Sequence, residues 1–134
     1  MTTTSPTPAT PLVVNDDGTL SMLLFQGRTN RLAITHRGLL DPTGYAARAC
    51  WRASYAGDAL LEASTEDGSI VMEAVVDEDD APAGTMLTIT LTDESCDEVA
   101  ASRGVWDVLV ESPGGEETPV IPSSPWRLWK KVAE

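Results

Sequence analysis

The sequence predicts a mainly β fold, an antiparallel β-sandwich with one short helix. Residues 45–53 and 85–91 alternate apolar and polar side chains, which is the period of a strand with one buried face. Asp-Gly pairs at 17–18 and 67–68 suit tight hairpin turns. Residues 92–104 combine a capping side chain, an acidic first turn and a closing glycine, and this combination predicts the helix.

The length of 134 residues suits one domain, and we expect a single β-sandwich domain over residues 12–134. Its 42% apolar and 22% charged residues are ordinary globular usage, so the chain can build a core. Residues 1–11 are Thr, Ser, Pro and Ala with one Met, which predicts a flexible N-terminal arm. Such an arm can become ordered on a neighbouring subunit.

The first half of the chain predicts four strands. Two short strands flank the NDDG turn at 15–18, and a third follows at 31–36, where Leu32 and Ile34 should face the core. After a turn that ends at Gly44, the segment 45–53 should place one face inward: Tyr45, Ala47, Ala49 and Trp51. We therefore expect Trp51 at the centre of the core.

A second Asp-Gly hairpin is expected over residues 59–76, with Leu61, Ile70 and Met72 among its apolar positions. The acidic run 77–80 that follows ends in Pro82 and Gly84, which marks an exposed loop. We do not assign it a metal, because solvated carboxylates in a flexible run lack a fixed ligand geometry.

The last third predicts a strand, the helix and two more strands. In residues 85–91 the apolar face is Leu87, Ile89 and Leu91. The helix should begin at Thr92 or Asp93, run for two to three turns and end at Gly104. Residues 105–111 alternate again, around Trp106, Val108 and Val110. Prolines 119, 122 and 125 interrupt the final segment, which predicts an edge strand or a strand with a break.

Charge excludes some partners. The net charge of −12 repels phosphate backbones and anionic lipids, so neither nucleic acid nor membrane is expected as a partner. The charge is unevenly placed, +2 over residues 1–53 and −14 over residues 54–134. This polarity serves solubility or guides head-to-tail contacts between copies. The first residues lack the basic start and the apolar run of a signal peptide, so we expect no export, and no apolar run is long enough to span a bilayer.

The sequence contains few of the residues and motifs that form catalytic or metal sites. Its one histidine, His36, stands at the end of a predicted strand, so no nucleophile has an evident base. Cys50 and Cys96 do not form a CxxC motif, and buried free thiols are expected. No phosphate-binding, zinc-protease or hydrolase motif is present. We therefore predict no enzyme activity, no catalytic residue, no cofactor and no metal.

Trp126 and Trp129 both fall in the last nine residues. Three interpretations stay open: one ring caps the core while the other lies against a basic stem, the pair anchors a protein interface, or it forms a sugar-binding platform. Alternation places Trp126 and Leu128 on one side, and Arg127, Trp129 and Lys131 on the other.

The segments LDPTGYAARACWRA, TMLTITLTDESCDEVAA and RGVWDVLVESPGG occur in an order that resembles the immunoglobulin-like N-terminal domain of phage baseplate upper proteins. The resemblance covers roughly residues 20–132. It lies in the turn Leu40, Thr43, Gly44 and Tyr45, the helix entrance Leu91 and Thr92, and the pair Trp106 and Asp107. The PGGEE turn and the proline-interrupted last segment depart from the family pattern.

The resemblance implies an immunoglobulin-like sandwich that acts as a non-enzymatic phage virion structural protein. Such a protein is made in the host cytoplasm and docks in the tail, baseplate, collar or fibre-attachment region. Its partners would be other virion proteins and copies of itself. Our hypothesis for the contact residues is Arg28, Arg31, Trp126 and Trp129. The alternatives are a carbohydrate-binding module for host surface glycans and a head decoration protein.

Overall fold

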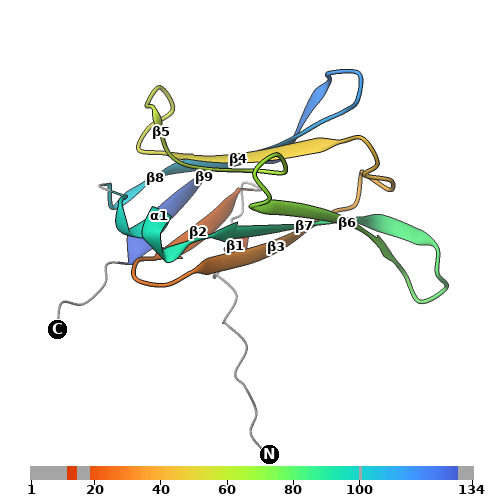
Figure 1. The fold of residues 1–134 in the computed structure, drawn as a ribbon, viewed down its shortest axis with the longest axis horizontal. Helices are drawn as coiled ribbons and strands as arrows, with labels where there is room; N and C mark the ends of the chain where they lie inside the picture. Colours follow the sequence, from red (N-terminus) through yellow and green to blue (C-terminus); the bar gives the residue numbers. More distant parts are fainter. Residues whose placement is uncertain (1–11, 15–18, 100, 130–134) are drawn as a thin grey trace, which may run out of the picture.

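The computed structural model describes residues 12–14, 19–99 and 101–129, and it forms two sheets that face each other (Figure 1). The larger sheet has six strands in the order β1-β2-β9-β8-β4-β5. These are β1 (Leu12–Val14), β2 (Leu20–Phe25), β9 (Glu117–Trp129), β8 (Arg103–Glu111), β4 (Ala46–Arg52) and β5 (Ala59–Ser64). The smaller sheet has the order β3-β7-β6, with β3 (Asn30–His36), β7 (Pro82–Leu91) and β6 (Ile70–Val76). The helix α1 (Asp93–Asp97) connects β7 to β8.

The connectivity is that of an immunoglobulin-like sandwich. Lettered B, C, C′, D, E, F and G in chain order, strands β3 to β9 give one sheet with the order B-E-D and another with the order G-F-C-C′. The predicted fold class, a mainly β immunoglobulin-like sandwich with one short helix, is therefore confirmed. One pairing differs from the expectation, because β2 and β9 run parallel while the other neighbouring strands are antiparallel.

Two stacked tryptophan rings fill the centre of the core. Trp51 of β4 is fully buried and stacks on Trp106 of β8, with 5.8 Å between ring centroids and 9° between planes. Both cysteines are free and buried. The indole nitrogens also find partners: Trp51 Nε1 donates to the sulfur of Met22 at 3.2 Å, and Trp106 Nε1 donates to the carbonyl of Leu20 at 2.9 Å. The prediction that Trp51 lies at the centre of the core is confirmed.

The alternation predicted the inward faces of the strands with two exceptions: Tyr45 is half-buried and precedes β4, and Cys50, predicted on the opposite face of β4, is also buried. Leu32 is buried and Ile34 is half-buried against the core. The inward residues of β4, β7 and β8 are Ala47, Ala49, Trp51, Leu87, Ile89, Leu91, Trp106, Val108 and Val110, all buried.

Two elements differ from the sequence prediction. Residues 59–76 are not a hairpin, because β5 pairs with β4 while β6 pairs with β7, so the turn between them crosses from one sheet to the other. The helix spans only Asp93–Asp97. Its cap is Thr92 as predicted, with the Thr92 hydroxyl accepting a hydrogen bond from the Ser95 N–H at 3.2 Å. Gly104 does not end the helix and instead lies inside β8.

The prediction of an edge strand or a broken strand is wrong for β9 as a whole, because β9 is one continuous strand between β2 and β8. Its prolines lie in a part of the strand that has one neighbour. Only Trp126 to Trp129 pair with β2, so the proline-containing half is bonded on one side, to β8. The β8–β9 register also shifts twice there, which accommodates residues without a ladder donor. The expected arm 1–11, the turn 15–18 and Lys131 lie outside the described residues.

Candidate interaction surface

The four contact residues of the hypothesis do not lie together. Trp129 ends β9 with 60% of its surface exposed, whereas Trp126, three residues earlier, is 1% exposed. Arg28 lies in the turn between β2 and β3, with its guanidinium 3.8 Å from the ring centroid of Phe25. Arg31 is exposed on the outer side of β3, in the other sheet. The structure therefore unites Arg28 with Trp129 and separates both from Arg31 and Trp126.

Trp126 is a structural residue. Its indole nitrogen donates to two backbone carbonyls, Arg52 O at 3.0 Å and Val105 O at 3.1 Å. These bonds join β9 to β8 and to the end of β4. Because the ring is buried and its donor is occupied, a neighbouring protein cannot contact it in this structure.

Strand pairing brings Trp129 to an aromatic neighbour. Trp129 is opposite Phe25 in the parallel β2–β9 ladder, and the two ring centroids lie 6.4 Å apart in a tilted arrangement. Arg28 covers the Phe25 ring, a cation–π geometry.

The position of Arg28 depends on a buried asparagine. Asn30 is 2% exposed, and its amide donates to the carbonyls of Phe25 at 2.7 Å and Arg28 at 3.1 Å, while its oxygen accepts from the Phe25 N–H at 2.9 Å. The N–H of Gly27 donates to the Asp97 carboxylate at 2.7 Å, which ties the turn to α1. The turn is therefore fixed from both sides.

Two further arginines lie beside Trp129. Arg127 precedes it by two residues on the same face of β9, and Arg103 is opposite Arg127 on β8. Both are exposed. We call the set Phe25, Arg28, Arg103, Arg127 and Trp129 the basic–aromatic patch. Sequence alternation already grouped Arg127 with Trp129, but Phe25 and Arg103 join them only through long-range strand pairing.

A carboxylate lies near the patch, since Asp97 of α1 accepts a hydrogen bond from the N–H of Gly27, the residue before Arg28. None of Arg28, Arg103 and Arg127 forms an ion pair with a carboxylate of the described residues. The ion pairs of this sheet lie elsewhere, Arg48 with Glu117 at 2.6 Å and Arg52 with Asp107 at 3.8 Å. Three arginines without an ion pair among the described residues therefore lie together on a chain with a net charge of −12.

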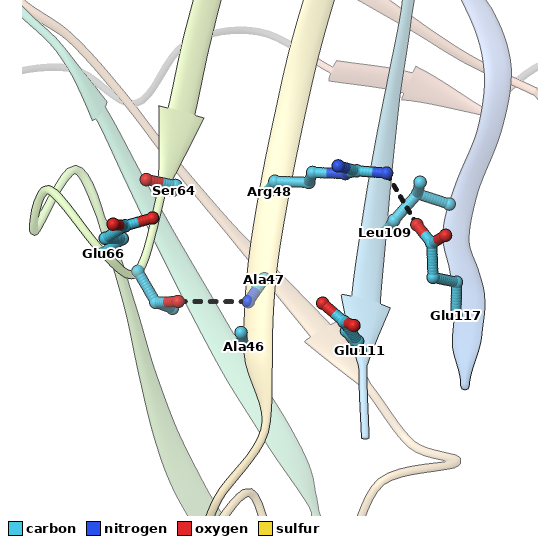
Figure 2. Close-up of a pocket in the computed structure, with 9 residues that line it drawn as sticks. Ala46, Ala47, Arg48, Ser64, Glu66, Leu109, Glu111 and Glu117 are labelled. Atoms are coloured by element: carbon cyan, nitrogen blue, oxygen red, sulfur yellow. Dashed lines mark hydrogen bonds and ion pairs between the residues drawn. The ribbon is translucent and has the colours of Figure 1, made fainter. Parts of the chain in front are cut away.

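A shallow hollow lies further along the same sheet. Figure 2 shows Arg48 reaching across Leu109 to Glu117, with Glu66 and Glu111 nearby. Its volume is about 170 Å³, smaller than the several hundred Å³ typical of small-molecule sites. The residues that line it offer carboxylates and one arginine but no histidine or cysteine. His36 lies on β3, in the opposite sheet.

The two cysteine thiols are buried. Burial raises the pKa of the Cys96 thiol to about 11, and its sulfur accepts a hydrogen bond from the Asn30 amide at 3.2 Å. Burial also raises the pKa of Cys50. Within the described part of the chain, no three His, Cys, Asp or Glu side chains gather as a metal site would require. The described residues also include no helix long and apolar enough to cross a membrane.

Comparison with known proteins gives likeness in fold only. No protein-family model and no curated protein matches the sequence. Among solved structures, the first immunoglobulin-like domain of human CD48 aligns with 95% of this chain and 94% of its own, at 13% identity and a TM-score of 0.37. A structure from a photo-crosslinking study of multimeric cell-adhesive interactions of VGSC beta subunits aligns with 83% of this chain over 90% of its own length, at 13% identity and a TM-score of 0.36. At such scores the strand order remains the basis of the fold assignment.

Proposed function

We propose that the protein is a non-enzymatic docking module that binds other proteins through the basic–aromatic patch. The observation that carries the proposal is Trp129, a large aromatic side chain that the fold leaves 60% exposed. Tryptophan and arginine are the residues most enriched at binding hot spots, where a neighbour removes their surface from water. Here both types stand together, with a phenylalanine beneath them.

The backbone that carries the patch residues is also preorganised in the free chain. Trp129 and Arg127 lie on β9, Arg103 lies on β8, and the Asn30 hydrogen bonds fix the turn that carries Arg28. Contact residues on rigid strands lose little conformational entropy on binding, so more of the contact energy remains as affinity.

The finer form of the proposal is a structural protein of a phage particle, made in the host cytoplasm and docked in the tail, baseplate, collar or fibre-attachment region. Its support is the sequence resemblance given above. The partners would be other virion proteins and copies of the chain, and the strong negative charge disfavours nucleic acid and anionic membranes.

Quantitative mass spectrometry of purified particles tests this role. Wild type should be present at a fixed copy number, and Trp129→Ala should reduce incorporation at least tenfold while the free chain stays folded. The matched control is Val71→Ala, because Val71 is a 48% exposed apolar residue on β6 of the other sheet. Absence of wild type from particles, or normal incorporation of Trp129→Ala, would refute the proposal. Glycan binding by the monomer, lost in Trp129→Ala, would assign the patch to carbohydrate recognition instead.

A further inference from the structure

From the placement of charge we infer that the basic–aromatic patch binds the acidic β6–β7 hairpin of a second copy, so that the chain assembles head to tail. The inference rests on the docking role proposed above and names one partner for it. Three observations carry it: three arginines of the patch that form no ion pair among the described residues, a hydrogen-bonded acidic hairpin, and the positions of the two surfaces at opposite ends of the molecule.

The patch can accept negative charge from a partner, because none of its three arginines forms an ion pair within the described residues. Arg103 and Arg127 are directly opposite each other in the β8–β9 ladder, and like charges at such a position repel. Arg28 adds a third positive charge beside Phe25. A partner that brings carboxylates relieves this repulsion and gains charge complementarity at once.

The hairpin between β6 and β7 presents such carboxylates on a hydrogen-bonded turn. Asp77 closes the turn, since its carboxylate accepts hydrogen bonds from the N–H groups of Asp79 at 2.8 Å and Ala81 at 3.0 Å. Glu78, Asp79 and Asp80 are exposed around it. Val76, at the base of the turn, is 57% exposed and offers an apolar surface to the aromatic rings of the patch.

The two surfaces lie at opposite ends of the long axis. Figure 1 shows the hairpin projecting beyond the sheets at one end, while β2 and β9 finish at the other. A hairpin at this distance cannot reach the patch of its own chain, so the contact forms between copies. Because each copy then uses two different surfaces, the contact is heterologous and extends into a ring or an open chain.

Sedimentation velocity of the purified full chain tests the inference with neutralising variants. At about 20 mM salt, wild type should grow beyond a dimer as concentration rises, and it should return to the 14.3 kDa monomer at about 500 mM salt. Arg103→Gln/Arg127→Gln and Glu78→Gln/Asp79→Asn should each weaken self-association about tenfold. The control Arg31→Gln/Arg48→Gln also removes two positive charges, but outside the patch and with loss of the Arg48–Glu117 ion pair, and it should associate like wild type.

Mixing the two variants separates a head-to-tail contact from a symmetric one. An equimolar mixture keeps one intact patch and one intact hairpin, so it should stop at a 1:1 dimer. A wild type that stays monomeric at low salt, association unchanged in either variant, or a mixture that forms no dimer would overturn the inference. None of these results would refute the proposed role in a particle, because that role is tested separately by the incorporation of Trp129→Ala into particles.

Discussion

Gly104→Ala should be among the most damaging single-methyl changes in this chain. Gly104 lies in β8 opposite Trp126, and a Cβ built on it stands 1.8 Å from the carbonyl oxygen of Arg52 and 2.8 Å from Trp126 Nε1. Since Cβ atoms essentially never approach within 3.0 Å of another heavy atom, backbone must move. The movement separates β8 from the end of β4 and breaks the Trp126 hydrogen bond to Arg52.

The magnitude follows from two contributions. Overpacking of this kind costs about 1–3 kcal/mol, and the lost hydrogen bond costs about 1 kcal/mol. The free energy of unfolding should therefore fall by about 2–4 kcal/mol, and the Tm by roughly 6–20 °C. This is a large share of the roughly 5–15 kcal/mol that stabilises a typical domain.

Urea unfolding followed by tryptophan fluorescence and far-UV circular dichroism measures this loss. Gly114→Ala is the matched control, because the nearest atom to its Cβ is the Ser112 hydroxyl at 3.8 Å and the change should alter stability by less than about 0.5 kcal/mol. Equal stabilities for the two variants would refute the close approach of β8 to β4.

Three other predictions concern the core. Trp126→Phe removes the indole donor and should lower the free energy of unfolding in urea by about 1–3 kcal/mol. Trp129→Phe should lower it by less than about 0.5 kcal/mol, and equal losses would contradict the buried and exposed positions of the two rings. Asn30→Ala should lower the free energy of unfolding by about 2–4 kcal/mol and speed amide exchange in residues 26–29, because the β2–β3 turn loses the Asn30 hydrogen bonds. Unchanged exchange would contradict the role of Asn30 in holding this turn. Because the pKa of Cys96 is raised in the folded chain, the unfolded chain releases the thiol proton at lower pH, and the free energy of unfolding should fall between about pH 9 and pH 11. Cys96→Ala should lose less stability than wild type over that range. Equal losses would refute the buried position of the Cys96 thiol.

Local periodicity was enough to place the inward faces of the strands. Alternation around Trp51 and Ile89 predicted which side chains are buried, because a sheet with one wet face imposes a period of two. It could not predict which strands pair. The Asp67-Gly68 turn has the same chemistry in a hairpin and in a crossing between sheets, so the β5–β6 crossing was missed.

The same limit applies to the interaction surface. Alternation put Trp126 and Trp129 on opposite faces, but which face is inward depends on the side of the larger sheet that packs against the smaller one. The patch gathers residues more than 70 positions apart, Arg28 with Arg103 and Arg127, and this proximity comes only from long-range pairing. Charge polarity along the chain was the one early indication of a directional contact.

Oxidative footprinting of the four tryptophans, in the isolated chain and in its native assembly, tests the docking role most directly. Trp129 is 60% exposed in the free chain and should be oxidised rapidly there, then protected at least severalfold in the assembly. Trp51, Trp106 and Trp126, each at most 1% exposed, should react slowly in both states. Oxidation of Trp129 at the same rate in both states would contradict the account.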